Sequence, residues 1–499
     1  MPSWALAKSP SVPTLTPDAV THHTIVLGGR TLAYTARAGT ITLRNAQDQP
    51  TARVFYTAYT LDGANPSRRA VTFLYNGGPG SSTMWLRMGS FGPVRVATPN
   101  GQIAGPPPYA IVANQYSLLD RTDLVFIDMP GSGFGRIIGA GTRKDFWGVD
   151  EDVAAFGQFI QRYVTTFNRW NSPRFLFGES YGTTRSSALA KYLQDEGISL
   201  NGVVLLSSFL NSNIDYNDGA PVGGGDWAYI LYLPTEVATA WYHHALGPAP
   251  PVETLISEVE NFALGEYLDA LGQGAMLAPD RYNDVVAKLH RFTGLSDQYI
   301  RNSNLRIPYD RFENELLRER GITVGRIDAR FQTYVLDRPE VSPDWDATDA
   351  AIDSAFVSSS NYYLRQVLKY NTPLLYKGQI YNEIYADGET WDFKHGDDNQ
   401  NLNVTPDLAQ AMTYNPRLKV FSANGYYDFA TPFFATVYAL QHLYLAPAIE
   451  RNITYGFYRS GHMVYLDPRA LSRFHDDLER WYRVILSPST ALRTGGVQG

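Results

Sequence analysis

The segment RFLFGESYGTT, residues 174–184, places a serine at a tight corner between two different patterns. A short apolar run precedes GESYG, residues 178–182, and a pattern typical of a helix follows it at once. A serine in G-x-S-x-G between a strand and a helix sits on a sharp turn that holds its hydroxyl above a sheet. Small residues are needed on both sides, because a Cβ there would collide with a neighbouring strand or helix. Ser180 is therefore a candidate nucleophile on a strand-turn-helix unit.

The pattern around this corner predicts an open, largely parallel sheet. From residue 70, short apolar runs alternate with helical segments: AVTFLYNGG, TDLVFIDMPG, a helix over about 150–167, RFLFGES, a helix to about residue 194, and LNGVVLLSSF. Buried strands that alternate with helices favour a parallel sheet with helices on its faces. Residues 22–61 have period-2 and β-branched stretches that predict antiparallel strands. Together with the serine corner, these patterns predict the α/β-hydrolase fold.

The alternation of strands and helices stops between about residues 210 and 406. Helix-like pieces such as PTEVATAWYHH and YDRFENELLRER stand there among Gly- and Asp-rich loops. The strand pattern returns at LKVFSANG and NITYGFYRSGH, and the amphipathic segment RALSRFHDDLERWYRVIL predicts a closing helix. We therefore predict one α/β-hydrolase core that is interrupted once. Its first part covers 20–209, an inserted and largely helical cap covers 210–406, and its second part covers 407–490.

The candidate nucleophile needs a base that removes its proton and an acid that orients the base. In this fold the acid and then the histidine follow the serine along the chain. His462 lies in the loop RSGHMVY after a predicted strand, whereas His442 and His475 lie in helical patterns. Asp428, in NGYYDFATP, follows the predicted strand LKVFSA, although an aspartate there could instead serve as a turn or N-cap residue. We assign Ser180 as nucleophile, His462 as general base and then acid, and Asp428 as the group that orients the histidine.

An oxyanion hole in this fold combines two backbone amides, one from the residue after the nucleophile and one from a Gly-rich loop after an earlier strand. Tyr181 follows the serine and supplies the first amide. The loop NGGPG, residues 76–80, follows the apolar run AVTFLY and supplies the second, because glycine lets the backbone approach a ligand closely. As a Gly-Pro turn alone, this loop would be unremarkable.

Composition excludes several classes of site and partner. The 42 basic and 49 acidic residues give a formal charge of −7 without a long basic block, so nucleic acid is not expected as a partner. The chain has no cysteine, which excludes disulfides, cysteine-ligated metals and a thiol nucleophile. No H-E-x-x-H spacing occurs either, so neither a metal nor another cofactor is expected.

Hydropathy patterning bears on the compartment. No apolar run approaches the roughly 18 residues that span a bilayer, so no membrane partner is expected. The start MPSWALAKSPSVPTLTP lacks the pattern of a signal peptide. This start fits an exported protein, periplasmic or extracellular, whose signal peptide is absent from this chain, and it also fits a cytoplasmic protein.

Taken together, these segments resemble the serine carboxypeptidases of peptidase family S10 over about residues 71–466. The motifs that carry the resemblance are NGGPGSS, DMPGSGFG, GESYG, NGYYDFATP and SGHMVY. The segments LPTEVATAWYHH and RNSNLRIPYDRFENELLRERGITVGRIDARF, with the lack of cysteine, are more similar to the bacterial branch. The resemblance implies that the protein removes C-terminal residues from peptides through an acyl-enzyme and without a metal.

The resemblance also implies roles for residues around the serine. In the family, the residues at the positions of Asn76, Gly77 and Glu179 hold the free carboxylate of the peptide. Those at the positions of Gly78 and Tyr181 form the oxyanion hole, in agreement with the placement above. Peptides with a free C-terminal carboxylate are therefore the expected partners.

The chain departs from the family pattern at two positions. Ser81 stands where the pattern NGGPGCSS has a disulfide-forming cysteine. Ser90, in MGSFGP, stands where the better-studied members carry a second glutamate that helps to bind the terminal carboxylate. Arg185 offers an alternative charge for that carboxylate, although an arginine in the first turns of a helix more often forms a surface or structural ion pair.

Other functions use the same fold and triad. Esterases do so, and relatives of the family include acyltransferases and hydroxynitrile lyases. A non-catalytic peptide-binding protein is a third alternative, but such a protein would normally have a substituted triad. Retention of Asn76 and Glu179 favours the peptidase. The sequence predicts no oligomeric state, and the side-chain preference at the cleaved bond depends on how the cap folds.

Overall fold

The computed structural model describes residues 15–214, 225–337, 339–396 and 401–487. The strands are β1 (Ala19–Leu27), β2 (Arg30–Arg44), β3 (Pro50–Leu61), β4 (Ala70–Tyr75), β5 (Val94–Val96), β6 (Ile111–Ala113), β7 (Thr122–Ile127), β8 (Arg136–Ile137), β9 (Arg174–Ser180), β10 (Gly202–Ser208), β11 (Ile322–Val324), β12 (Gln332–Tyr334), β13 (Lys419–Gly425) and β14 (Ile453–Tyr458). The α-helices are α1 (Met84–Gly89), α2 (Val149–Thr166), α3 (Tyr181–Asp195), α4 (Trp227–Tyr242), α5 (Val252–Phe262), α6 (Leu268–Gln273), α7 (Pro279–Thr293), α8 (Asp297–Asn302), α9 (Tyr309–Glu315), α10 (Ala347–Tyr362), α11 (Tyr381–Ile384), α12 (Thr405–Tyr414), α13 (Phe433–Gln441), α14 (Pro447–Glu450) and α15 (Pro468–Leu486).

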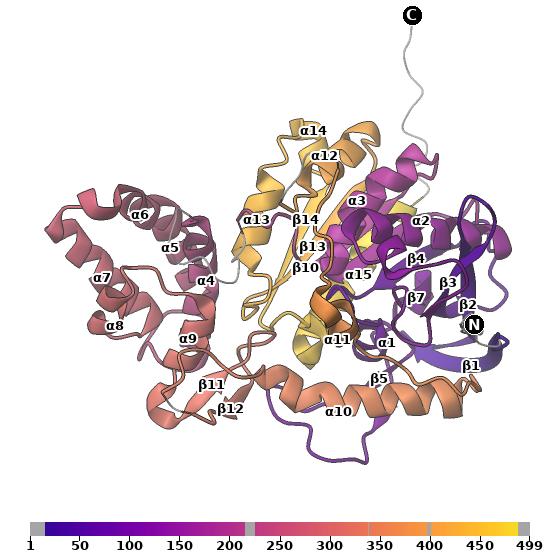
Figure 1. The fold of residues 1–499 in the computed structure, drawn as a ribbon, viewed down its shortest axis with the longest axis horizontal. Coiled ribbons are helices and arrows are strands. Elements are labelled where there is room, and N and C mark those ends of the chain that lie inside the picture. Colours follow the sequence, from indigo (N-terminus) through magenta and orange to yellow (C-terminus); the bar gives the residue numbers. More distant parts are fainter. Residues whose placement is uncertain (1–14, 215–224, 338, 397–400, 488–499) are drawn as a thin grey trace, which may run out of the picture.

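A ten-stranded sheet forms the centre of the molecule (Figure 1). Its strand order is β1-β2-β3-β7-β4-β9-β10-β13-β14, with β8 paired to β3. The pairs from β1 to β7 are antiparallel, as the alternating pattern of residues 22–61 predicts for its own strands. From β7 to β14 every pair is parallel. This mostly parallel sheet is that of the α/β-hydrolase fold, which confirms the predicted fold class.

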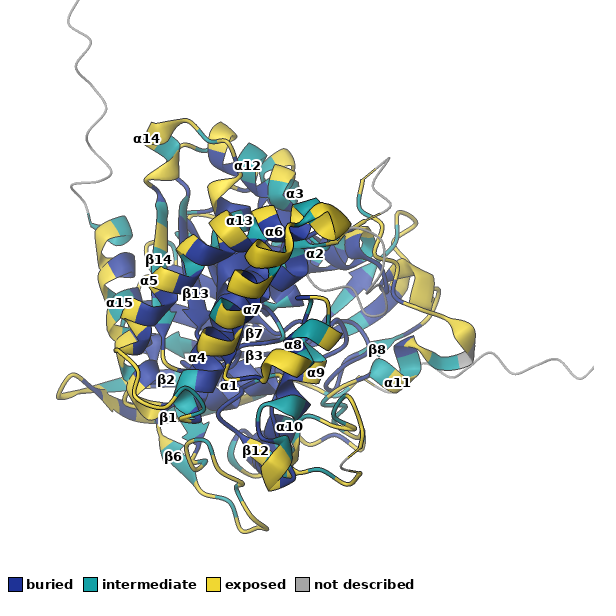
Figure 2. Cartoon of the chain, turned by 90° about the vertical axis from the view of Figure 1, so that its left-hand side faces the viewer, coloured by how far each residue is buried: buried dark blue, intermediate teal, exposed yellow. Residues whose placement is uncertain are grey.

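The parallel strands are continuous apolar runs because both of their faces are covered. All residues of β4, β7 and β10 are buried. On β4, Phe73 belongs to the core beneath α2 and α3, whereas Leu74 belongs to the core beneath α1 and α15. Figure 2 shows the strands in the middle of the sheet, such as β7 and β13, as buried and the outer faces of the surrounding helices as exposed. Among the described residues, no helix is long and apolar enough to cross a membrane.

The residues between β10 and β13 are inserted into this core (Figure 1). They form two parts, of which the first contains α4 to α9 and the second contains α10 to α12. Helices α4 to α9 form a lobe beside the sheet, with the β11-β12 hairpin at its base. Helix α10 packs against α1 of the core, and α12 packs against α3. The division into 20–209, 210–406 and 407–490 stays a prediction, and the boundary at 406 falls in the first turn of α12. Residues 1–14, where a signal peptide was considered, and 488–490 lie outside the described residues.

Two helices of the insertion differ from their sequence patterns. Helix α4 begins at Trp227, seven residues before the start of the helix-like piece, and contains Pro234 in its interior. A proline inside a helix removes one backbone hydrogen bond, but α4 is buried over most of its length and packing stabilises it. Helix α9 ends at Glu315, and a 3₁₀ turn ends at Gly321 in a left-handed conformation.

Candidate active site

Ser180 stands at the end of β9, and α3 begins at the next residue. Its backbone has φ 62° and ψ −132°, a conformation that residues other than glycine seldom adopt. A Cβ at Gly178 would lie 2.0 Å from the carbonyl oxygen of Gly182, so the corner closes only with glycine at that position. The strained turn brings Ser180 to the wall of a cavity of about 260 Å³.

The loops after β13 and β14 bring the predicted acid and base together. Since β9, β10, β13 and β14 are parallel neighbours, their carboxyl ends lie at the same edge of the sheet. Asp428 follows β13, His462 follows β14, and His462 Nδ1 lies 2.9 Å from Asp428 Oδ2. His462 lines the same cavity as Ser180, whereas Asp428 is fully buried. All three residues predicted as a triad thus lie at one end of the sheet.

Thr431 ties the acid to the histidine. Its backbone N–H donates to Asp428 Oδ1 at 2.9 Å, and its hydroxyl donates to Asp428 Oδ2 at 2.8 Å. The same hydroxyl oxygen lies 3.0 Å from His462 Nδ1. Asp428 therefore has both of the roles weighed for it, as a turn residue and as the partner of the imidazole. Sequence reasoning missed Thr431, although an Asp-x-x-Thr spacing at a turn is a usable signal.

The surroundings of His462 favour its charged form. Burial alone would lower the pKa of His462, but the charge of Asp428 and the hydrogen bond to it raise the pKa above its ordinary value. The negative charge of Glu179 acts in the same direction. Because Nδ1 is engaged by Asp428, Nε2 is the nitrogen that can exchange a proton with a nucleophile.

Glu179 is buried but lines the cavity beside Ser180. The Tyr465 hydroxyl donates to Glu179 Oε2 at 2.9 Å and to Oε1 at 3.2 Å, and Asn76 lines the same cavity. Burial raises the pKa of Glu179 to about 7, although the charge of His462 and these hydrogen bonds favour the carboxylate. Near neutral pH the group therefore exists in both forms, and its protonated form can donate a hydrogen bond.

The Gly-rich loop touches the backbone of the serine corner. A Cβ at Gly77 would lie 2.4 Å from the amide nitrogen of Tyr181, so only glycine allows this approach. Gly78 has φ +112° and lines the cavity together with Gly77 and Asn76. The structure therefore brings the predicted oxyanion loop and the Tyr181 amide next to each other at the cavity wall.

Arg185 does not line the cavity. Its guanidinium is fully buried and forms an ion pair with Asp152, with 2.7 Å between Nε and Oδ2. It also donates to the carbonyl oxygen of Asn76 at 2.9 Å. Arg185 thus forms the structural ion pair that was the alternative for it, and it holds the Gly-rich loop from behind.

The two departures from the family pattern have different surroundings. The hydroxyl groups of Ser81 and Tyr381 lie 2.8 Å apart, which links the Gly-rich loop to the insertion without a disulfide. Backbone hydrogen bonds from Ser82 to Gly378 and from Ile380 to Gly80 join the same two segments. Ser90 is fully buried and donates to the carbonyl oxygen of Leu86 at 2.6 Å. Its hydroxyl is thus engaged within α1 and does not line the cavity.

The insertion builds the opposite wall of the cavity. Its lining residues are Arg326, Ile327, Asp349, Gln379 and Tyr381. Sequence reasoning predicted none of them, because their positions depend on how the insertion packs onto the core. The segment GRIDARF, which includes two of them, gave no signal of its own from spacing or composition.

One segment of the insertion holds the acid and histidine loops together. The His462 amide donates to the carbonyl oxygen of Ile327 at 2.7 Å, and the Phe429 amide donates to that of Arg326 at 3.0 Å. The Ala329 amide donates to the carbonyl oxygen of Tyr427 at 2.9 Å. The geometry of the candidate triad therefore depends on residues 326–329.

A buried ion network anchors this segment. Arg330 pairs with Asp328 in a bidentate geometry and with Asp467, the N-cap residue of α15, at 2.9 Å. It also donates to Ser460, two residues before the histidine, at 3.0 Å. These bonds join the insertion to the His462 loop.

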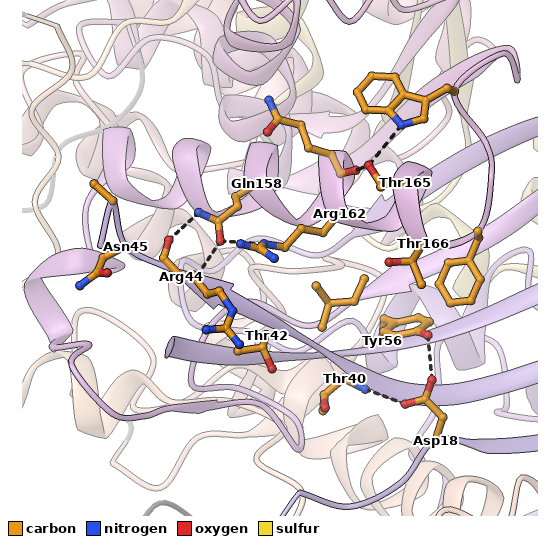
Figure 3. Close-up of a pocket in the computed structure, with 15 residues that line it drawn as sticks. Asp18, Thr40, Thr42, Arg44, Asn45, Tyr56, Gln158, Arg162, Thr165 and Thr166 are labelled. Atoms are coloured by element: carbon orange, nitrogen blue, oxygen red, sulfur yellow. Dashed lines mark hydrogen bonds between the residues drawn. The ribbon is translucent and has the colours of Figure 1, made fainter. Parts of the chain in front are cut away.

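A larger cavity of about 820 Å³ lies between β2 and α2 and shares no lining residue with the Ser180 cavity (Figure 3). Its polar side chains bond to each other and to nearby backbone. Gln158 donates to the Arg44 carbonyl oxygen at 2.9 Å, Arg162 donates to Gln158 at 3.2 Å, and Tyr56 donates to Asp18 at 3.3 Å. Within the described ranges, no group of three or more His, Asp or Glu side chains could hold a metal ion.

A model of the serine carboxypeptidase family matches residues 31–246 of the chain. A curated relative, serine carboxypeptidase-like 45 of Arabidopsis thaliana, is 26% identical over 185 residues, which are 35% of this chain and 37% of the relative. The matched segment thus spans little more than a third of that relative's length. A similar solved structure is Kex1(Δ)p, a prohormone-processing carboxypeptidase from Saccharomyces cerevisiae, with a TM-score of 0.54 and 16% identity. That alignment covers 89% of this chain and 91% of the other, and it shows that the two share a fold.

Proposed function

We propose, from the match of residues 31–246 to the serine carboxypeptidase family model and from the geometry of the site, that this chain is a serine-type carboxypeptidase that releases C-terminal residues from peptides. The observation that carries this proposal is a single cavity lined by Ser180, His462, Glu179 and Asn76. The first two side chains supply the chemistry of acyl transfer. The last two supply hydrogen bonds for a carboxylate next to the reacting bond.

In the proposed reaction, His462 Nε2 takes the proton of Ser180 as its oxygen attacks the carbonyl carbon of the last peptide bond. The amides of Gly78 and Tyr181 stabilise the resulting oxyanion. His462 then gives the proton to the leaving amino group, and the peptide remains as an ester on Ser180. Water, deprotonated by His462, attacks this ester, and His462 returns the proton to the Ser180 oxygen as the shortened peptide leaves. Asp428 holds the imidazole in the required tautomer and stabilises its charge.

Recognition of the free C-terminus is assigned to Asn76, Gly77 and Glu179. An ionised Glu179 would repel a substrate carboxylate, whereas the protonated group can donate a hydrogen bond to it. The raised pKa of Glu179, which burial brings to about 7, supports this role because the proton is held up to near-neutral pH. No metal takes part in the proposed reaction, so chelators should leave turnover unchanged.

The decisive experiment compares kcat/KM for an N-blocked dipeptide acid with kcat/KM for its C-terminal amide. A carboxypeptidase should strongly prefer the acid. Equal turnover of both, or turnover of simple esters alone, would favour the esterase or acyltransferase alternative. Covalent reaction of Ser180 with an organophosphonate would exclude the non-catalytic peptide-binding protein.

The proposal extends to the compartment. We expect an exported protein, periplasmic or extracellular, that acts on peptides outside the cytoplasm. The alternative is a cytoplasmic protein. Fractionation of the source cells tests this, and recovery of the activity from the cytoplasm alone would contradict it.

A further inference from the structure

Arg326 places a guanidinium at the wall of the Ser180 cavity. The residue follows β11 and lines the cavity together with Glu179, Ser180 and His462. Its side chain is exposed to the cavity, although its backbone is fixed by the bond from Phe429. In the described part of the chain, no hydrogen bond or ion pair engages this guanidinium. Arg326 is thus a well-positioned cation whose donors are open to a ligand.

Two other arginines near the site, Arg185 and Arg330, are engaged by protein groups. Arg185 pairs with Asp152, and Arg330 pairs with Asp328 and Asp467. A guanidinium away from bulk water is stable when its donors find acceptors, and these two arginines satisfy that requirement internally. Arg326 differs from them because no acceptor of the described chain bonds to it, so its donors face water or a ligand in the cavity.

The charges near Arg326 keep it protonated without pairing with it. Although burial alone would lower the pKa of Arg326, tyrosines and carboxylates around it, among them Glu313 and Asp346, raise that pKa. Asp349 also lines the cavity, and burial, followed by the charges of Asp346 and Asp353, raises the pKa of Asp349 to about 7. Near neutral pH, therefore, Arg326 has a permanent charge while Asp349 is only partly ionised. The cavity favours an anion at Arg326.

We propose that Arg326 determines specificity by binding a carboxylate of the peptide substrate through charge-assisted hydrogen bonds. The inference rests on the proposed carboxypeptidase function and adds a residue that the family resemblance does not supply. The position of the second family glutamate holds Ser90, whose hydroxyl is engaged within α1, so the cavity lacks an acid from that side. The carboxylate is either the C-terminal α-carboxylate or the side chain of an acidic residue beside the cleaved bond.

The test uses the full-length enzyme with Arg326→Gln, which keeps hydrogen-bond donors but removes the charge. Two matched substrate pairs separate the two sources of carboxylate. One pair is an N-blocked dipeptide acid and its C-terminal amide. The other pair has Glu or Gln beside the cleaved bond, in otherwise identical peptide acids. Arg326→Lys keeps the charge without the planar fork, and it should restore part of the lost specificity.

Loss of one charge-assisted contact should lower kcat/KM by about 10- to 100-fold for the substrate whose carboxylate Arg326 binds. The loss should appear mainly in KM, and the neutral member of the pair should change less than twofold. Arg281→Gln is the charge-matched control, because Arg281 lies in α7 on the outer lobe and pairs with exposed Asp269. That control should change neither ratio.

Each outcome has a definite reading. A reduced acid-to-amide ratio in Arg326→Gln assigns the α-carboxylate, and a reduced Glu-to-Gln ratio assigns the side-chain carboxylate. If both ratios equal those of the unmodified enzyme while the melting temperature is unchanged, the proposal is wrong. Failure of the proposed function shows differently, because the unmodified enzyme itself would then fail to prefer the acid over the amide. In that case the Glu-to-Gln ratio still decides whether Arg326 binds carboxylates.

Discussion

The two walls of the Ser180 cavity are built in different ways. The core wall consists of loops at the carboxyl ends of β4, β9, β13 and β14, and it contains Ser180, His462 and the Gly-rich loop. The insertion wall contains Arg326, Asp349 and Tyr381, which come from segments far apart in the sequence. The sheet positions the first wall, whereas backbone bonds at residues 326–329 and at Ile380 hold the second against the core. We infer that the core wall contains the reacting groups and the proposed contacts of Glu179 with the C-terminus, and that the insertion wall adds a second determinant of substrate choice.

The largest expected effect comes from changes to the triad residues of the core wall. Ser180→Ala and His462→Ala should each lower kcat by roughly 10⁴ to 10⁶, and the double variant should lose little more, because triad members act as a unit. Steady-state turnover of a peptide acid measures this, with circular dichroism to confirm folding. The control is His475→Ala, in α15, which should retain full activity. If either single variant kept more than a tenth of the activity, the triad assignment would be wrong.

The next largest effect on kcat concerns Asp428 and Thr431, which contact His462 Nδ1. Asp428→Asn should lower kcat by about 10⁴, because an amide at this position no longer selects the required tautomer. Thr431→Val removes only the hydroxyl that bridges Asp428 and His462, and it should cost about tenfold. The graded loss is measured as kcat on one substrate at one pH. Equal losses in the two variants would mean that Thr431 does more than orient the pair.

The contrast between the walls also explains what the sequence could predict. Continuous apolar runs identified the parallel strands, and Ser180, Asp428 and His462 follow strand ends, where the register of the sheet leaves little freedom. A fold-level rule then gave their order along the chain. The catalytic roles of these residues stay predictions.

The insertion wall could not be predicted in the same way. Arg326 follows a three-residue strand and Asp349 lies in the first turn of α10, and neither position follows from a periodic pattern. Their approach to Ser180 depends on long-range packing, such as the bond from the Ile327 amide to Asp346 at 2.8 Å. The sequence did not predict the role of Tyr465 for a similar reason, because its contact with Glu179 joins the segment after β14 to the end of β9.

The link between the walls can be broken at Arg330. Arg330→Met leaves Asp328 and Asp467 buried without their partner, which should lower the free energy of unfolding by about 3–5 kcal/mol. Urea unfolding at constant protein concentration measures this change. Because the His462 amide is bonded to Ile327 in the same segment, kcat should fall as well.

A matched surface variant tests whether the loss of stability in Arg330→Met is specific to the buried network or follows from removing any ion pair. Arg480→Met removes a pair between Arg480 and Asp477 on α15, where the arginine is exposed. Exposed pairs contribute only about 0.2–1 kcal/mol, so this variant should unfold near the unmodified enzyme and keep its kcat. Equal unfolding midpoints for Arg330→Met and Arg480→Met would show that the buried network does not stabilise the link between the walls.

The smallest expected effect is the pH dependence of KM for peptide acids, which distinguishes the contribution of the core wall to substrate binding from that of the insertion wall. Burial raises the pKa of Glu179 to about 7, so the group is protonated below that pH and donates to the substrate carboxylate. As the pH rises through 7 the proton is lost, the carboxylates repel each other, and KM for peptide acids should rise by up to about tenfold per pH unit. KM for the matching amides should stay nearly constant. KM is the informative quantity, because kcat also follows the protonation of His462.

Glu179→Gln, which donates a hydrogen bond at every pH, should flatten the rise of KM with pH for peptide acids. The charge of Arg326 does not change in this pH range. If Arg326 binds the α-carboxylate, Arg326→Gln should therefore raise KM at every pH. KM should also rise more steeply with pH, because no permanent charge then holds the substrate once Glu179 is ionised. The two variants therefore separate a titrating contact on the core wall from a permanent charge on the insertion wall. If Glu179→Gln leaves the pH dependence unchanged, Glu179 does not bind the C-terminus, and recognition of the carboxylate belongs to the insertion wall, with Arg326 as its first candidate.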